Sequence, residues 1–204
     1  VELREPFQQI AQSKGAMLRL LSFMRNIEMG YMDSLYHCKL HAADVTNRLL
    51  AIMSKTELIN VPVGQRVNLG LVAMVAGAVH DFGHPQKSNA FLISQGHEIA
   101  MDFNDQSVAE NYSIRQSMYL LREDGCNFLS SLLGQSHSRT KKTFRQFVIQ
   151  MVLGSDMSKH FDILSRFKAR VAENDELCNA SSVNEKWSLM DESQQTLAMQ
   201  MAMK

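Results

Sequence analysis

Four of the seven histidines of this chain lie in two short segments. The first segment holds His37 and His41, and the second holds His80 and His84, with Asp81 directly after His80. Imidazole nitrogen and carboxylate oxygen are ligand types that a divalent ion such as zinc accepts together. These residue types therefore predict a metal site that assists a hydrolytic reaction.

The two segments differ in how strongly they support this interpretation. His37 and His41 are four positions apart, so a helix would place both on one face, one turn apart. Taken alone, this pair fits an ordinary polar helix face equally well. His80 and Asp81 end an apolar helical pattern, where a buried carboxylate is costly unless it is paired or bound to a metal. The second segment therefore favours the metal site.

Two further pairs of polar residues lie next to apolar helical segments, and the simpler interpretation of each pair is a helix cap. Asn104 or Asp105 can cap the helix expected after them, and Ser155 or Asp156 can cap the next one along the chain. Local sequence does not decide which residue of each pair is the cap. For whichever residue of each pair caps the helix, capping is the default interpretation, and a functional role needs support from outside the local sequence.

The composition is that of a globular protein, with 45 % hydrophobic and 21 % charged residues. Because 21 basic residues balance 21 acidic ones, bulk charge gives no reason to expect a nucleic-acid partner. The three cysteines are widely spaced and favour a reducing compartment. We see no signal-peptide layout, and the longest apolar run is shorter than the about 20 residues of a membrane span. We therefore expect no transmembrane segment and a cytoplasmic protein, or the cytosolic domain of a larger one.

Helical periodicity dominates the chain, so we expect an all-α fold. No alternation of useful length predicts a strand, and the polar, mixed residues 172–185 are expected to form a loop. Pro85 must end the apolar helix that precedes it. Helices are expected over residues 7–29, 35–53, 65–79, 88–102, 105–122, 139–153, 156–172 and 190–204.

Taken together, four sequence blocks resemble the catalytic domain of the class I cyclic-nucleotide phosphodiesterases, which belong to the histidine-aspartate metal phosphohydrolases. The blocks follow the family's order and comprise residues 36–45, 80–92, 104–111 and 155–160. One block alone would carry little weight, whereas four at family-like spacing make coincidence improbable. The resemblance extends over nearly the whole chain and implies the multi-helix phosphodiesterase fold, amino-terminal portion only.

The resemblance implies roles for individual residues. His37 would be the general acid that protonates the leaving 3′ oxygen. The first metal, typically Zn²⁺, would be bound by His41, His80 and Asp81, and Asp81 would bridge to a second, typically Mg²⁺ or Mn²⁺. The residues that would orient phosphate and water are His84, Glu110, Ser155 and Asp156. The residues that would line the substrate pocket are Tyr36 and Met157.

The implied reaction is metal-dependent hydrolysis of 3′,5′-cyclic nucleotides, cyclic AMP or cyclic GMP or both, to 5′-nucleoside monophosphates in signal transduction. The cyclic diester is anionic, so it repels hydroxide, and its leaving group is poor. Two metals help with both difficulties, because they bind the phosphate and lower the pKa of a bound water. A histidine with a pKa of about 6.5 suits protonation of the leaving oxygen. The family also implies regulatory domains outside this chain and is compatible with a dimer.

The chain departs from the family pattern at several positions. Cys38 stands where the family usually has Asn, Gln86 where it has Gly, and Ser155 where it has Thr. Tyr112–Ser113 replaces a His-His pair, which removes two ring nitrogens from near the site. We expect this last change to weaken the hydrogen bonding that supports the metal ligands.

The family's fourth metal ligand, an Asp, follows a helix that resembles residues 196–204, and its purine-recognising Gln comes later still. We therefore expect residues 1–204 to be a partial catalytic domain with weak activity or none. Two alternatives are another histidine-aspartate phosphohydrolase and a degenerate, non-catalytic helical module. The blocks around Glu110 and Asp156 oppose the first alternative, and the six retained polar residues of the site oppose the second.

Overall fold

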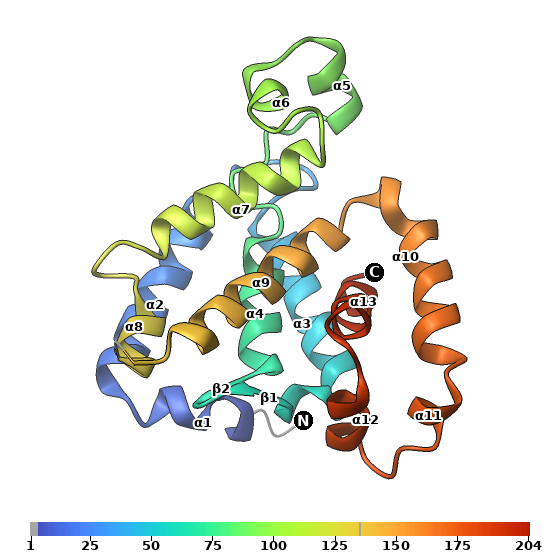
Figure 1. The fold of residues 1–204 in the computed structure, drawn as a ribbon. Helices are drawn as coiled ribbons and strands as arrows, with labels where there is room; N and C mark the ends of the chain where they lie inside the picture. The colour runs from blue at the N-terminus through green and yellow to red at the C-terminus, as the bar shows by residue number, and fades with distance from the viewer. Residues whose placement is uncertain (1–3, 135) are drawn as a thin grey trace.

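The structure is a computed structural model that describes residues 4–134 and 136–204. Residues 1–3, which begin the expected partial domain, lie outside the described residues. The described ranges are almost wholly helical, with one short antiparallel β-hairpin (Figure 1). The expectation of an all-α fold is therefore confirmed. No helix within these ranges is both long and apolar enough to cross a membrane.

The helices of the described ranges are α1 (Arg4–Ala11), α2 (Lys14–Met29), α3 (Lys39–Lys55), α4 (Leu69–Val79), α5 (Asn89–Ser94), α6 (Glu98–Asp102), α7 (Val108–Leu120), α8 (Phe128–Leu133), α9 (Ser138–Gly154), α10 (His160–Phe167), α11 (Asp175–Cys178), α12 (Val183–Leu189) and α13 (Glu192–Ala202). Single turns of 3₁₀-helix occur at η1 (Leu58–Asn60) and η2 (Met157–Lys159), and a π-helical turn, η3 (Lys168–Ala172), follows α10. The strands are β1 (Pro62–Gly64) and β2 (Val67–Asn68).

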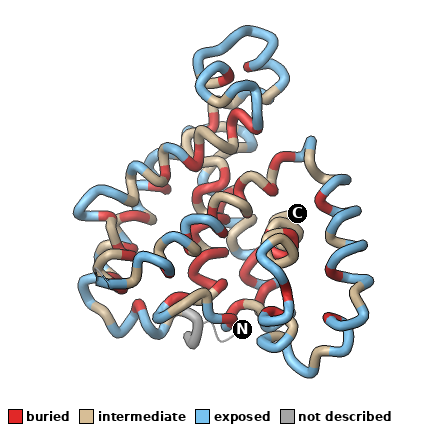
Figure 2. The backbone as a smooth tube through the Cα atoms, in the orientation of Figure 1, coloured by how far each residue is buried: buried red, intermediate tan, exposed pale blue. Residues whose placement is uncertain are grey.

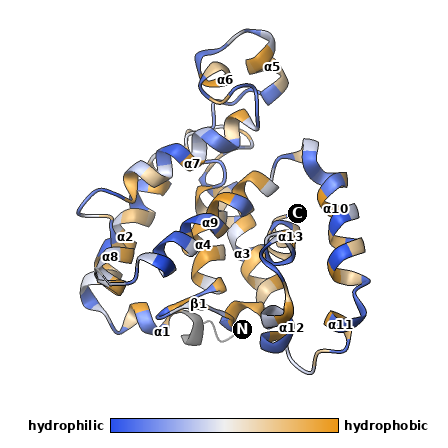
Figure 3. Cartoon of the chain, viewed as in Figure 1, coloured by the Kyte–Doolittle hydropathy of each residue, from blue (hydrophilic) through white to orange (hydrophobic). Residues whose placement is uncertain are grey.

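Helix α4 lies at the centre of the molecule, surrounded by α2, α3 and α9 (Figure 1). It is apolar on all sides, and all of its residues but Met74 and Ala78 are buried (Figures 2 and 3). The sequence predicts this central helix from residue 65, but the helix begins at Leu69, because residues 62–68 form the hairpin that the sequence analysis does not anticipate. Asn68 caps the helix by accepting a hydrogen bond from the Leu71 N–H at 3.0 Å.

Helix α3 crosses α4 and begins at Lys39, four residues later than expected. Cys38 precedes it in an extended conformation (φ −122°, ψ 173°), and its N–H donates to the Tyr36 carbonyl in a tight turn. His37 therefore lies outside the helix. The expectation that His37 and His41 share one helix face is wrong, because the chain turns before the helix starts.

The region expected to be one helix over residues 88–102 is divided into α5 and α6. Gly96, with φ +56°, ends the first helical stretch, and the His97 ring accepts a hydrogen bond from the Ile99 N–H at the start of α6. These two short helices project from the body of the molecule and are largely exposed (Figures 1 and 2). A small separate core of Leu92, Ala100 and Val108 holds them to the start of α7.

Two expected helix starts differ from the structure. The expected first helix, residues 7–29, is divided into α1 and α2, because Ser13 caps a new helix by accepting from the Ala16 N–H. The expected cap of α7 at Asn104 or Asp105 is wrong: both residues have positive φ, and Ser107 precedes the helix without a side-chain cap bond. In each case a local turn governs the boundary.

The carboxyl-terminal elements α10 to α13 lie to one side of α9, on which α13 packs (Figure 1). The expected loop over residues 172–185 is wrong in part, because α11 and the start of α12 lie within it. The sequence analysis also gives no sign of α8, which is six residues long. The expected helix at residues 190–204 is confirmed as α13, which starts with a reciprocal capping box between Asp191 and Gln194.

Candidate metal centre

Three side chains converge where α3 passes the end of α4. His41 comes from the first turn of α3, and His80 and Asp81 follow the last residue of α4. The Nε2 atoms of His41 and His80 are 3.3 Å apart, and Asp81 Oδ2 lies 3.5 Å from the first and 3.1 Å from the second. The expected grouping of these three residues is therefore observed in the structure.

This triangle fits a divalent ion. Tetrahedral zinc with ligands at about 2.1 Å places those ligand atoms about 3.4 Å from one another. The observed separations run from 3.1 to 3.5 Å, and the three atoms belong to one group whose ligand atoms all lie within 4.8 Å. Two imidazoles with one carboxylate is also a ligand set found at zinc and related ions. The residues could therefore hold one metal with little rearrangement.

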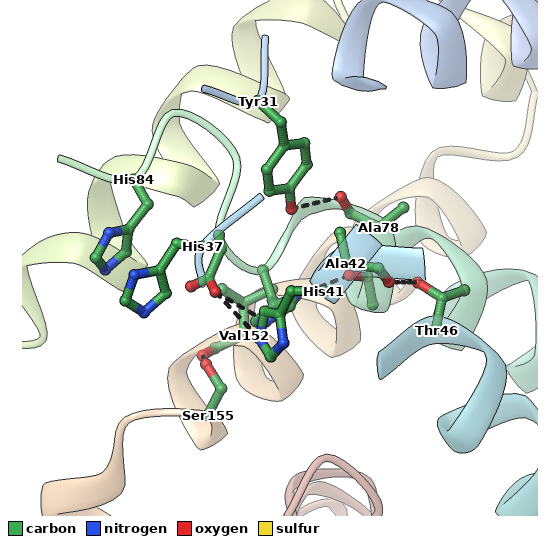
Figure 4. Close-up of polar contacts among 12 residues, drawn as sticks. Tyr31, His37, His41, Ala42, Thr46, Ala78, His84, Val152 and Ser155 are labelled. Atoms are coloured by element: carbon green, nitrogen blue, oxygen red, sulfur yellow. Dashed lines mark hydrogen bonds and ion pairs between the residues drawn. The ribbon is translucent and has the colours of Figure 1, made fainter. Parts of the chain in front are cut away.

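A close crossing of α3 and α4 brings the ligands together. A β-carbon at Gly77 would lie 2.9 Å from Thr46 Cα, so the missing side chain allows the two helices to approach. Thr46 in turn donates its hydroxyl to the Ala42 carbonyl at 2.7 Å and stays close to its own helix (Figure 4). The position of His41 relative to His80 therefore depends on a glycine one turn before His80.

Main-chain groups fix the orientation of the second histidine. His80 Nδ1 lies 2.8 Å from the Gly77 carbonyl oxygen, which can only accept, so Nδ1 carries the proton. Nε2 then faces His41 and Asp81 with its lone pair available for a metal. Tyr31 supports the same helix end from outside, because its hydroxyl donates to the Ala78 carbonyl at 2.9 Å (Figure 4).

The pKa values of the three residues suit metal binding in part. Burial and the neighbouring His80 lower the pKa of His41, so this ring is neutral at pH 7. Burial raises the pKa of Asp81, but the hydrogen bond and the charge of His80 outweigh burial and hold it below its usual range. Burial opposes protonation of His80, but Asp81 and the Gly77 carbonyl raise its pKa. Protonation of His80 therefore competes with metal binding at this site.

A second pair of histidines lies beside this group. The rings of His37 and His84 stack with centroids 3.7 Å apart and planes at 19° (Figure 4). His84 Nδ1 accepts a hydrogen bond from the Gln86 N–H at 3.0 Å, and burial lowers the pKa of His84 to about 4. His84 is therefore neutral at pH 7 and carries its proton on Nε2. The His37 ring is 6.3 Å from the His41 ring, so the stacked pair adjoins the candidate ligands.

The two residues expected to line a pocket are both exposed. The centroid of the Tyr36 ring lies 5.0 Å from that of the His37 ring and 4.6 Å from that of the His41 ring. The Tyr36 side chain is exposed to solvent. Met157, on η2, is 70 % exposed. The structure therefore places Tyr36 at the edge of the histidine group, whereas Met157 is a surface residue here.

Glu110 lies in the first turn of α7, and its carboxylate is held by the side chain of Asn89, the first residue of α5. The Asn89 amide donates to Glu110 Oε2 at 2.9 Å, and its oxygen accepts from the Ala109 N–H at 2.9 Å. Burial raises the pKa of Glu110, and the charges of Asp156 and Asp81 add to this. Glu110 is therefore part of one electrostatic group with the candidate metal ligands.

Ser155 and Asp156 are engaged locally. The Ser155 hydroxyl donates to the Val152 carbonyl at 2.7 Å, at the end of α9 (Figure 4). Asp156 caps η2, as the simpler interpretation predicts, by accepting from the Ser158 N–H at 2.9 Å. It also accepts from the buried Ser107 hydroxyl at 2.7 Å. Burial raises the pKa of Asp156, but hydrogen bonds from Ser158 and Ser107 outweigh burial and lower it, so the carboxylate is ionised at pH 7.

The replacement of the family's His-His pair has a visible consequence. The Tyr112 hydroxyl accepts a hydrogen bond from the Gln116 amide at 2.8 Å on the next turn of α7. Ser113 is fully buried, and its hydroxyl has no hydrogen-bond partner among the described residues. Neither side chain supports His41, His80 or Asp81 through a hydrogen bond given by the structure.

Several residues that shape the site are absent from the sequence-based set. Asn89 and Ser107 lie inside the blocks that carry the resemblance. Their position in these blocks could have identified them as partners of Glu110 and Asp156. Tyr31 and Gly77 act through contacts with residues distant in sequence, and no local pattern identifies them. Gln86 stands out only as a departure from the family pattern.

The chain is similar to known proteins over most of its length. Residues 36–204 match the family model described as 3′5′-cyclic nucleotide phosphodiesterase. The chain is 36 % identical over 152 residues to "Probable 3′,5′-cyclic-AMP phosphodiesterase pde-4" of Caenorhabditis elegans. It is also 36 % identical over 155 residues to "3′,5′-cyclic-AMP phosphodiesterase, isoform F" of Drosophila melanogaster. Both alignments cover 74 % of this chain and 22 % of the relative, so the chain spans about a fifth of the length of these relatives.

A solved structure shares the fold. The phosphodiesterase domain of Salpingoeca rosetta rhodopsin phosphodiesterase superposes with a TM-score of 0.76 at 22 % sequence identity. The superposition covers 97 % of this chain and 56 % of that one. The helical arrangement expected from the sequence blocks is therefore confirmed at the level of the fold.

Proposed function

Because the chain belongs to the 3′,5′-cyclic nucleotide phosphodiesterase family, we propose that it contributes to metal-dependent hydrolysis of 3′,5′-cyclic nucleotides to 5′-nucleoside monophosphates in signal transduction. The relatives reported above are named cyclic-AMP phosphodiesterases, so cyclic AMP is the first substrate to test, with cyclic GMP beside it. Residues 1–204 would be part of one catalytic domain. The cytoplasmic location and the regulatory domains outside the chain stay predictions.

The observation that carries the proposal is the convergence of His41, His80 and Asp81. These residues come from two blocks about 40 positions apart, both inside the family-matching segment, and their ligand atoms form one triangle. A cluster of two imidazoles and a carboxylate at the end of an apolar helix is costly unless it has a partner such as a metal. The geometry supports the reaction class.

The proposed roles follow the positions of the side chains. His41, His80 and Asp81 would hold Zn²⁺, with Asp81 shared with a second ion, Mg²⁺ or Mn²⁺. When bound, such ions neutralise a phosphodiester and acidify water.

His37 would give its proton to the leaving 3′ oxygen, and it lies close enough to the ligand group to reach a phosphate held there. His84, neutral and stacked on His37, would donate its Nε2 proton to a phosphate oxygen or to water.

The remaining residues would shape the surroundings of the phosphate. Glu110, whose pKa is raised by burial, is suited to sharing a proton with water near Asp81. Ser155 and Asp156 would act at the edge of the site, Asp156 through the hydrogen bonds that order the turn after α9. Tyr36, at the edge of the histidine group, and Met157, exposed on η2, would contact the nucleoside.

The test is a comparison of cyclic and linear substrates. The purified chain is incubated at high concentration, because weak activity is expected, with cyclic AMP, cyclic GMP or the linear diester bis(p-nitrophenyl) phosphate. Zn²⁺ together with Mg²⁺ or Mn²⁺ is added, and products are separated by chromatography. We expect 5′-AMP or 5′-GMP, and a loss of about 10²-fold or more in kcat for His37→Ala.

The control variant is His97→Ala, because His97 is exposed and starts α6, which projects from the body of the molecule (Figure 1). It should retain full activity. Hydrolysis of the linear ester alone would favour another phosphohydrolase. Because residues 1–204 alone are expected to have weak activity or none, the decisive negative result is a folded chain that binds no Zn²⁺, which would favour the non-catalytic module and contradict the proposal.

A further inference from the structure

Gln86 adopts a backbone conformation that its residue type does not favour. Its φ is +58°, in the left-handed region, where a residue with a side chain is strained by roughly 1 kcal/mol or more. Such strain persists only where surrounding contacts compensate for it. The family pattern has Gly here, which adopts this conformation without cost. The question is therefore what the glutamine side chain contributes in return.

The contacts of Gln86 give the answer. Its side-chain amide donates to the His37 carbonyl oxygen at 3.1 Å and to the His84 carbonyl oxygen at 3.3 Å. Its main-chain N–H donates to His84 Nδ1 at 3.0 Å, which fixes the orientation and the tautomer of that ring. One residue thus holds both members of the stacked pair, although they are 47 positions apart in the sequence. A glycine would provide only the main-chain contact.

His37 needs such support because it has little of its own. It lies before the first residue of α3, in a segment without regular structure. Its neighbours Leu35 and Tyr36 are exposed and do not anchor the segment in the core. Apart from its edge contacts with the exposed Tyr36 ring and with the His41 ring, His37 is located by the stacking on His84 and the hydrogen bond from Gln86.

We propose that Gln86 is a positioning residue, which uses its side-chain amide to hold His37 against His84 in the geometry needed for proton transfer. This inference rests on the proposed function, because the role of His37 as general acid belongs to that function. Displacing an acid by about 1 Å can cost about 10²-fold in rate. The tether is a property of this chain, since it requires a side chain where the family pattern has none.

The experiment compares Gln86→Met and Gln86→Gly with the unaltered chain. Methionine has a similar length and no charge but cannot donate, and glycine removes the tether while relieving the positive φ. The Gly variant therefore folds even if the Met variant does not. The control is Gln116→Met, which also removes an amide donor, on α7, but one that bonds Tyr112. The primary readout is the nuclear Overhauser cross-peak between the ring protons of His37 and His84.

We expect the cross-peak in the unaltered chain and in Gln116→Met, and its loss or strong weakening in both Gln86 variants. An unchanged cross-peak in both Gln86 variants would overturn the proposal. The second readout is kinetic. We expect kcat for the cyclic nucleotide to fall about 10- to 100-fold in Gln86→Met, with KM within about threefold.

An unchanged kcat in a variant that has lost the cross-peak would also overturn the proposal, because the held geometry would then be irrelevant to proton transfer. A failure of the proposed function looks different. In that case the unaltered chain shows the cross-peak but hydrolyses no cyclic nucleotide, and the cross-peak alone decides whether Gln86 positions the pair.

Discussion

The Tyr31 hydroxyl donates a hydrogen bond of 2.9 Å to the carbonyl oxygen of Ala78, across 47 residues of sequence. Ala78 lies in the last turn of α4, and the next turn of chain carries His80 and Asp81. One phenol from the segment after α2 therefore satisfies a main-chain carbonyl at the helix end that presents His80 and Asp81.

Replacing Tyr31 by Phe should lower both stability and metal affinity. The change leaves the Ala78 carbonyl without this partner, which should lower the free energy of unfolding by about 1–2 kcal/mol. Because the ligand turn loses its support, zinc affinity should fall about tenfold. Urea denaturation of the metal-free protein and calorimetric zinc titration measure the two effects. Tyr119→Phe is the control, since its ring is exposed, and it should change stability by less than about 0.5 kcal/mol. Equal effects of the two variants would show that Tyr31 has no special role.

Replacing His80 by Ala should abolish tight zinc binding. Mutating a group that merely supports a ligand typically costs 10–100-fold in affinity, so loss of a ligand should cost more than about 100-fold. Zinc content after dialysis, measured by plasma mass spectrometry, tests this. His97→Ala, at the exposed start of α6, should keep the zinc of the unaltered chain. Stoichiometric zinc in a folded His80→Ala protein would mean that the ligand set is wrong.

Gly77 and Gly15 give a matched pair of helix glycines with opposite expected effects. An alanine at 77 would place its β-carbon 2.9 Å from Thr46 Cα and force α3 away from α4, which should destabilise the protein by about 1–3 kcal/mol. Gly15 lies on the exposed side of α2, with only the Arg19 side chain near, so alanine there should stabilise by about 0.5–1 kcal/mol. Thermal unfolding measures both. Because α3 carries His41, Gly77→Ala should also weaken zinc binding, whereas a stable, zinc-binding Gly77→Ala protein would refute the close-crossing argument.

Two of the three candidate ligands could be predicted from the residues themselves because they are adjacent, whereas His41 joined them only through the resemblance to the phosphodiesterase family. His80 and Asp81 are neighbours at the end of an apolar run, and this places them at a buried helix terminus whatever the rest of the chain does. The central position of α4 follows from the same run, which is apolar on every side. Both inferences depend on short-range information alone.

The remaining parts depend on contacts that no local pattern encodes. His37 and His41 have helical spacing, yet the turn at Tyr36–Cys38 places His37 outside α3. The hairpin at residues 62–68 occupies what looked like the first turn of α4, and α8 is too short to show periodicity. The stacking of His37 on His84 and the crossing at Gly77 arise only when distant segments meet. Contacts between distant segments therefore determine how the side chains of the site are arranged, whereas sequence patterns indicate only which residues belong to it.

His84 should make the metal-free protein less stable as the pH falls from about 6.5 to about 4. Burial lowers the pKa of His84 to about 4 in the folded state, against an ordinary value of 6.5. Between these values the unfolded chain binds a proton at this position and the folded chain does not, so acid favours unfolding. Above 6.5 both states are neutral, and below 4 both are protonated, so the effect is confined to this window. The expected loss from His84 is roughly 2 kcal/mol.

The measurement is the free energy of unfolding at pH 7 and pH 4.5, with a chelator present, for the unaltered chain and for His84→Asn. Asparagine does not titrate, and its oxygen can still accept from the Gln86 N–H. Titratable groups distant from His84 contribute equally to both proteins and cancel in the difference. The unaltered chain should therefore lose roughly 2 kcal/mol more than the variant on acidification. If the two proteins lose stability in parallel, His84 is not a buried neutral histidine, and its proposed donation of the Nε2 proton to phosphate loses its basis.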